Sequence, residues 1–94
     1  MNITEYKTSL QQSTAPSSLS KPLQALWYAA KNDWNKAHEL IQDEPDAASA
    51  WVHAYLHRVE GDEFNTRYWY NRANQAVSNE SFDREWEKIA STLI

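Results

Sequence analysis

Two histidines on one predicted helix are the residues whose spacing best suits chemistry. His53 and His57 are four positions apart, and Glu60 follows one turn later. Residues at i and i+4 share a helix face, so both imidazoles can reach one Zn²⁺, with the carboxylate as a third ligand. The alternative is a helix face whose histidines bond to neighbouring side chains. No fourth ligand is evident, so metal or small-molecule binding by this face is the second hypothesis, and no cofactor is predicted.

The third histidine lies on a different predicted helix. His38 falls at the edge of the apolar stripe of the helix over residues 34–43. A histidine at such a position is expected to pack against its neighbours with its ring nitrogens hydrogen-bonded.

Arg58 is the one charged residue within the apolar arc of its helix. Because an unpaired buried charge is costly, its guanidinium needs a partner. The favoured interpretation is a structural ion pair with Asp62 or Asp33, or stacking on a tryptophan. The functional interpretation is an arginine that awaits a carboxylate or phosphate ligand.

Two aromatic residues break the pattern of the next predicted helix. Phe64 and Tyr68 are one turn apart, on the side opposite Trp69. The polar residues around them are Arg67, Asn71, Arg72 and Gln75. An exposed aromatic pair in such company has the composition of an interface hot spot. Alternatively, the helix over residues 82–93 or the N-terminal segment covers the pair.

Several classes of protein find no support in the composition. No glycine-rich phosphate loop, nucleophile triad or paired-carboxylate arrangement is present, so no catalytic activity is predicted, and Glu85 and Glu87 are expected to be solvated. The net charge is −4 without a Lys/Arg stripe, which disfavours nucleic acid. The chain has no cysteine for disulfides and no apolar run long enough for a membrane span, and a cytoplasmic location is expected by default.

The elements that position these residues are all predicted to be helices. One Gly and three Pro are too few for a strand-rich fold with many tight turns. Apolar spacing and capping residues predict helices over residues 21–32, 34–43, 47–60, 63–77 and 82–93. The N-terminal segment, residues 1–19, is predicted to hold a short helix over residues 3–12 and a Ser/Pro-rich linker, and residues 20–94 form the helical domain.

A short repeat marks the junctions between paired helices. The segments KNDWNKA at residues 31–37 and EGDEFNT at residues 60–66 are offset by 29 residues. Each contains a residue that tolerates left-handed backbone, Asn32 or Gly61, followed by an aspartate that can cap the next helix. Each also has a small residue, Ala37 or Thr66, which permits close approach of two helices. Repeats of this kind stack as helical hairpins.

The repeat resembles the tetratricopeptide-like (TPR-like) helical repeats. The matching residues are Ala25, Tyr28, Asp33, Trp34, Ala37 and Pro45 in the first unit, and Gly61, Asp62, Tyr70 and Ala73 in the second. The run EGDEFNTRYWYNRA is also similar to a segment of small bacterial proteins. The resemblance implies an all-α fold of antiparallel helix pairs stacked as a short right-handed superhelix, with residues 82–93 as a C-terminal capping helix. It also implies a scaffold that binds a protein or peptide.

We therefore expect a groove lined by the helices over residues 21–32 and 47–60. The candidate groove residues are Tyr28, His53, His57 and Arg58. Phe64 and Tyr68 are candidates for a second surface. A homo-oligomer is a further expectation, because the ends of a five-helix stack can be covered by other chains.

Overall fold

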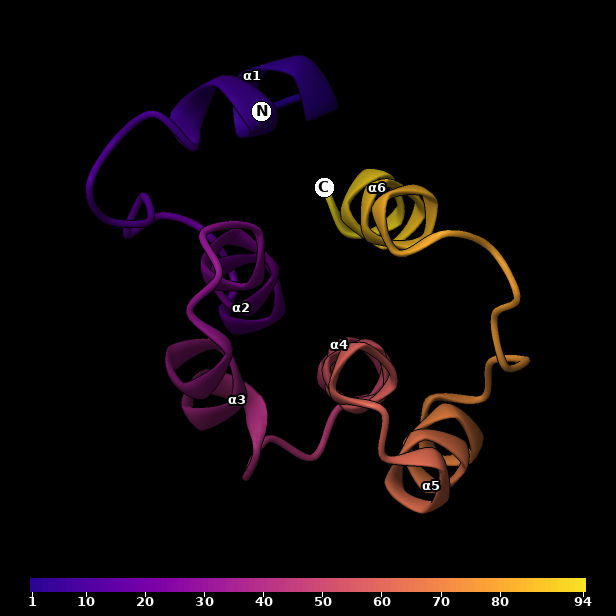
Figure 1. Cartoon of the computed structure of the whole chain (residues 1–94). Helices are drawn as coiled ribbons and strands as arrows, with labels where there is room; N and C mark the ends of the chain where they lie inside the picture. The colour runs from indigo at the N-terminus through magenta and orange to yellow at the C-terminus, as the bar shows by residue number, and fades with distance from the viewer.

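Six α-helices and no strand make up the regular structure of the computed structural model, which describes residues 1–94 (Figure 1). The helices are α1 (Ile3–Ser9), α2 (Lys21–Ala30), α3 (Trp34–Ile41), α4 (Ala47–Glu60), α5 (Glu63–Ala73) and α6 (Phe82–Leu93). The predicted all-α class is thus confirmed. None of these helices combines the length and the apolar character that crossing a membrane requires.

The turns within the two helix pairs share one backbone geometry. Asn32 and Gly61 adopt left-handed backbone, with φ of 62° and 88°. The next residue then donates its N–H to a carbonyl five positions back, from Asp33 to Tyr28 at 2.9 Å and from Asp62 to His57 at 3.0 Å. These are the bonds of a Schellman helix end. Both aspartates also cap the following helix through their side chains, as the sequence repeat predicted.

α4 is the central element of the fold. It packs against α2, α3, α5 and α6, and α2 packs mainly against α3 (Figure 1). Every residue from Ser49 to His57 is buried, so α4 has no wide solvent-facing side over this stretch. The helix therefore presents a different set of neighbours in each direction, and polar residues on it must find partners on other helices.

The C-terminal helix does not cap the end of the helix stack, contrary to the sequence prediction. α6 packs against α2 and α4 (Figure 1), and it meets α5 through a side-chain hydrogen bond from Tyr70 to Glu85 and not through helix packing. α5 ends at Ala73 rather than near Val77, because Asn74 takes left-handed backbone with φ of 61°. The extended chain over residues 74–81 then returns to α4. On α6, which follows this segment, the Trp86 indole N–H donates to the carbonyl of Leu26 on α2 at 2.8 Å.

The N-terminal segment joins the same hydrophobic core. Tyr6 on α1 is fully buried, its hydroxyl donates to the carbonyl of Leu23, and its ring stacks on Trp86 with centroids 5.6 Å apart. Ser9 accepts a hydrogen bond from the indole N–H of Trp27 at 3.0 Å. α1 and α6 thus hold each other against α2.

Candidate functional site

The three histidines of the chain meet between α3 and α4. His38 comes from α3, and His53 and His57 come from successive turns of α4. The Nε2 atoms of His38 and His53 lie 3.0 Å apart. One ring nitrogen from each of the three residues lies within 4.8 Å of the other two. We call these residues the histidine cluster.

Two tryptophans fix the rings of the histidine cluster. The Trp34 indole stacks on His38 with centroids 4.8 Å apart and planes 9° apart. Trp69 of α5 stacks on His53 with centroids 3.8 Å apart and planes 16° apart. Trp34 is held in turn by its indole N–H, which donates to the carbonyl of Leu56 at 2.7 Å. Three helices therefore set the orientation of the imidazoles.

Burial favours the neutral form of two members of the histidine cluster, His38 and His53, because it lowers the pKa of each. Burial, together with the neighbouring His38 and His57, lowers the pKa of His53 to about 3. Burial and the nearby His57 also lower the pKa of His38. Uncharged imidazoles at pH 7 can accept a hydrogen bond or a metal ion through an unprotonated nitrogen.

The sequence placed His53 and His57 on a polar helix side, but they are only 4% and 8% exposed. α3 and α5 cover this side of α4, which the pattern of α4 alone does not reveal. His38 packs and hydrogen-bonds as expected, yet its place beside the other two histidines was not predicted. The Glu60 carboxylate lies 2.8 Å from His57 Nδ1. Glu60 therefore orients the His57 ring, although it is not one of the three clustered histidines.

Arg58 belongs to a second polar cluster, on the side of α4 that faces α6. Its guanidinium forms an ion pair with Glu85 at 2.9 Å and also donates to the carbonyl of Glu80. The other Glu85 carboxylate oxygen accepts from the Tyr70 hydroxyl. The Arg58 guanidinium also lies over the Phe82 ring, 4.8 Å from its centroid. We call Arg58, Glu85 and Tyr70 the arginine cluster.

The arginine cluster corrects two sequence predictions. The partner of Arg58 is neither Asp62 nor Asp33, and Glu85 is not solvated but only 2% exposed. Both corrections have one cause. α6 packs against α4, and this packing places the Glu85 carboxylate beside Arg58. Arg58 is already paired, so it does not stand open to a ligand.

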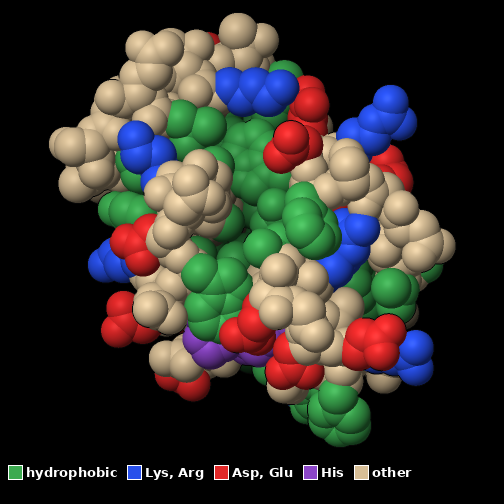
Figure 2. All heavy atoms as spheres, in the orientation of Figure 1, with side chains coloured by type: hydrophobic (Ala, Val, Ile, Leu, Met, Phe, Trp, Pro, Cys, Tyr) green, Lys and Arg blue, Asp and Glu red, His purple; other side chains and the backbone are tan.

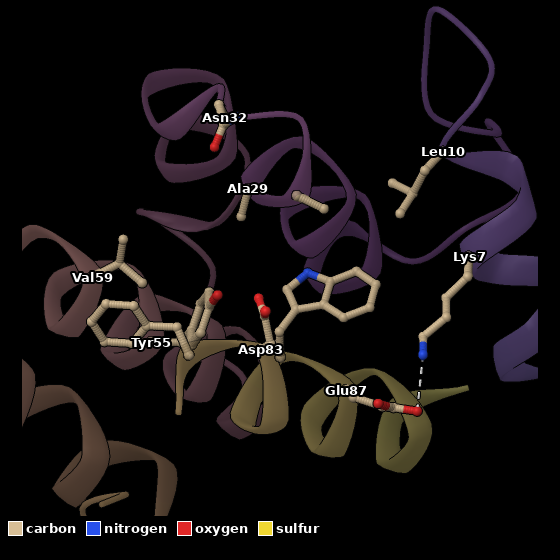
Figure 3. Close-up of a pocket in the computed structure, with 11 residues that line it drawn as sticks. Lys7, Leu10, Ala29, Asn32, Tyr55, Val59, Asp83 and Glu87 are labelled. Atoms are coloured by element: carbon tan, nitrogen blue, oxygen red, sulfur yellow. Dashed lines mark ion pairs between the residues drawn. The ribbon is translucent and has the colours of Figure 1, made fainter. Parts of the chain in front are cut away.

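An apolar groove opens between α2, α4 and α6, next to α1. Figure 2 shows hydrophobic side chains gathered in a hollow in the middle of this face, with charged side chains around it. The groove encloses about 590 Å³. Its apolar lining consists of Leu10, Ala29, Ala30, Tyr55, Val59, Phe82 and Trp86 (Figure 3). Lys7 and Glu87 close one end through an ion pair of 3.0 Å, and Asp83 lies at the rim (Figure 3).

The residues that the sequence assigned to a groove on α2 and α4 do not line this one. His53, His57 and Arg58 belong to the two polar clusters on α4. The Tyr28 hydroxyl accepts from the backbone N–H of Ala15 at 3.4 Å, so the ring faces the N-terminal segment. The groove that the structure shows borders the same two helices, but α6 packs between them and the opening lies at their C-terminal turns.

The aromatic pair of α5 lies on the surface. Phe64 is 80% exposed and Tyr68 is 45% exposed. α5 packs mainly against α4 and meets α6 at the Tyr70–Glu85 hydrogen bond, on another side, so neither α6 nor the N-terminal segment covers the pair. The Arg72 guanidinium donates to the Tyr68 hydroxyl at 2.9 Å and lies over the Trp69 ring, which orders this surface.

Comparison with known proteins returned no similar protein. The chain matches no protein-family model, and no match was found among curated proteins or among solved structures.

Proposed function

We propose that this domain is a non-catalytic protein-interaction module that holds a segment of a partner protein in the groove between α2, α4 and α6. The observation that carries this proposal is the apolar lining of a hollow of about 590 Å³ at the surface. A pocket of this size falls within the range of ligand sites, about 300–1,000 Å³, and an apolar opening within a charged rim is typical of a binding surface.

The chemistry of the groove favours a peptide segment with an apolar anchor. Tyr55, Phe82 and Trp86 supply aromatic surface for a leucine, isoleucine or phenylalanine side chain. Asp83 has no salt-bridge partner at the rim, whereas Glu87 is paired with Lys7. We therefore expect a lysine or arginine next to the anchor of the partner. This extends the scaffold role that the TPR-like resemblance implies.

The face of α5 supports a second contact with the same or another protein. Phe64 is the most exposed large apolar side chain of the chain, and an Arg-supported tyrosine stands one turn away. Aromatic and arginine residues are enriched in the centres of interfaces. Two separate surfaces would let one domain bridge two partners.

A peptide selection tests the groove. A phage-displayed library of random peptides would be selected on the full chain, and the affinities of enriched peptides would be measured on variants. Ala29→Trp fills the groove from α2 and should weaken binding at least about tenfold. Phe64→Ala removes apolar surface from α5 and is the matched control, with binding expected to stay unchanged.

Three outcomes would contradict the proposal. The first is a library from which no peptide is enriched. The second is a set of peptides that bind Ala29→Trp as tightly as the parent chain. The third is binding that falls with Phe64→Ala alone, which would place the surface on α5. Far-UV circular dichroism on each variant checks that the helices are intact.

A further inference from the structure

We propose that the histidine cluster binds one first-row transition-metal ion, with Zn²⁺ as the reference ion, through one ring nitrogen each of His38, His53 and His57. This site is separate from the groove and does not depend on the proposed interaction function.

The distances between the ring nitrogens are close to those that a metal imposes. Two nitrogens bound to tetrahedral Zn²⁺ at about 2.0–2.1 Å lie about 3.3–3.4 Å apart. The His38 and His53 Nε2 atoms are 3.0 Å apart, and all three donors lie within 4.8 Å of one another. Small rotations of the imidazoles are enough to bring them to one ion.

The surroundings of His57 and His53 fit metal ligation. A metal-binding histidine usually donates its other ring N–H to a carboxylate, a backbone carbonyl or water. His57 Nδ1 lies 2.8 Å from Glu60, which leaves Nε2 for the metal. His53 Nδ1 and the Ser49 hydroxyl are the two buried side-chain polar atoms without a partner, one helical turn apart. With the metal on Nε2, His53 Nδ1 carries a proton that this hydroxyl can accept after a rotation of Ser49.

The alternative ligand set, His57 with Glu60 and Asp62, is less suited to a metal. The Asp62 carboxylate already accepts from the backbone and side-chain N–H groups of Asn65, at 3.1 and 2.7 Å. It caps α5 in this way and would lose the cap on turning toward an ion. We therefore assign Glu60 a positioning role and His38 the role of third ligand.

The histidine cluster also has a route of entry and an open coordination position. His38 is only half-buried. Histidine atoms reach the surface on the face shown in Figure 2, with carboxylates beside them. Three protein ligands leave the fourth tetrahedral position of Zn²⁺ for water or an exogenous group.

Metal titration of the untagged full chain tests the proposal. Zn²⁺ would be titrated in competition with a chromophoric chelator, and Co²⁺ would be followed by visible absorption. We expect one ion per chain with a Kd of about 1 μM or tighter, and Co²⁺ bands of four-coordinate intensity. His38→Gln should weaken Zn²⁺ binding at least about 100-fold, because it leaves two protein ligands. Asp62→Asn keeps a capping side chain and is the matched control, with unchanged affinity expected.

A measurement on the parent chain keeps the test independent of how variants fold. Long-range ¹H–¹⁵N spectra should show Nε2 of all three imidazoles shifting together at one equivalent of Zn²⁺. Shifts confined to His57, or a Kd weaker than about 100 μM, would overturn the proposal in favour of a packed histidine network. Unchanged Zn²⁺ affinity in His38→Gln, or loss of affinity in Asp62→Asn, would also overturn it.

Discussion

The histidine cluster and the arginine cluster lie on two sides of the same helix, and their polar groups are satisfied in different ways. Arg58, Glu85 and Tyr70 satisfy one another with a guanidinium, a carboxylate and a hydroxyl. The histidine cluster instead places three imidazole rings together and leaves His53 Nδ1 without a partner. A cluster that is complete within the chain stabilises the position of α6. A cluster with an unpaired buried polar atom retains hydrogen-bonding capacity that the rest of the chain does not use.

Removal of Glu85 should have the largest effect on stability. Glu85→Ala leaves the Arg58 guanidinium without its carboxylate and the Tyr70 hydroxyl without its acceptor, so we expect a loss of about 3 kcal/mol in unfolding free energy. Urea denaturation measures it. The double variant Arg58→Met/Glu85→Leu removes both charges and should recover much of the loss. A cost below about 1 kcal/mol for Glu85→Ala would rank this pair with surface ion pairs.

Acid should destabilise the metal-free chain through the histidine cluster. Below pH 6.5 the unfolded chain binds a proton at His53, while the folded chain, in which the pKa of His53 is about 3, does not. The unfolding free energy should therefore fall as the pH falls, by about 1 kcal/mol between pH 6.5 and 5.5 for this one group. Denaturation at the two pH values measures the change.

His53→Phe is the control for the pH experiment, because it keeps an aromatic ring against Trp69 and removes the titrating group. The pKa values of Asp46 and Asp62 are lowered in the folded chain. These two groups therefore change the unfolding free energy only near and below the usual pKa of an aspartate, which lies under this pH window. A pH dependence that persists undiminished in His53→Phe would assign the effect to other groups.

Glu60, which lies beside His57 but is not assigned as a ligand, should affect metal affinity more weakly than a ligand does. Glu60→Gln keeps the shape of the side chain but weakens the bond to His57 Nδ1. We expect Zn²⁺ affinity to fall about tenfold, the lower end of the effect of such supporting groups. The chelator competition measures it. A loss as large as that in His38→Gln would make Glu60 a direct ligand.

The smallest effect is expected on the face of α5. Phe64 is 80% exposed, so Phe64→Ala should change the unfolding free energy by no more than about 0.5 kcal/mol. Urea denaturation measures it. A cost above about 1 kcal/mol would show that the ring is covered in solution, for example by a second copy of the chain.

Local signals in the sequence predicted the helices well. The bounds of α4 and α6 agree with the prediction, and the turns at Asn32 and Gly61 have the left-handed backbone that their residue types favour. α5 was predicted too long, because Asn74 can continue a helix or end it. Caps and left-handed residues act within one turn of the chain, so a sequence pattern can reveal them.

The polar clusters could not be predicted from the same signals. His38 meets His53 only because α3 packs against α4, and Glu85 reaches Arg58 only because α6 returns to α4. The direction in which α6 returns depends on the buried Tyr6 and Trp86, far from the residues that it brings together. Helical periodicity identifies the inner face of each helix but does not identify the helix against which that face packs.

The stacking of Tyr6 on Trp86 joins the two ends of the chain. A linear array of helical hairpins unfolds piecewise, because each unit touches only its neighbours. Here the Trp86 indole bonds to a carbonyl 60 positions away, and Lys7 on α1 pairs with Glu87 on α6. These contacts link helices that are far apart in the sequence within one core, so the domain should unfold in a single all-or-none transition.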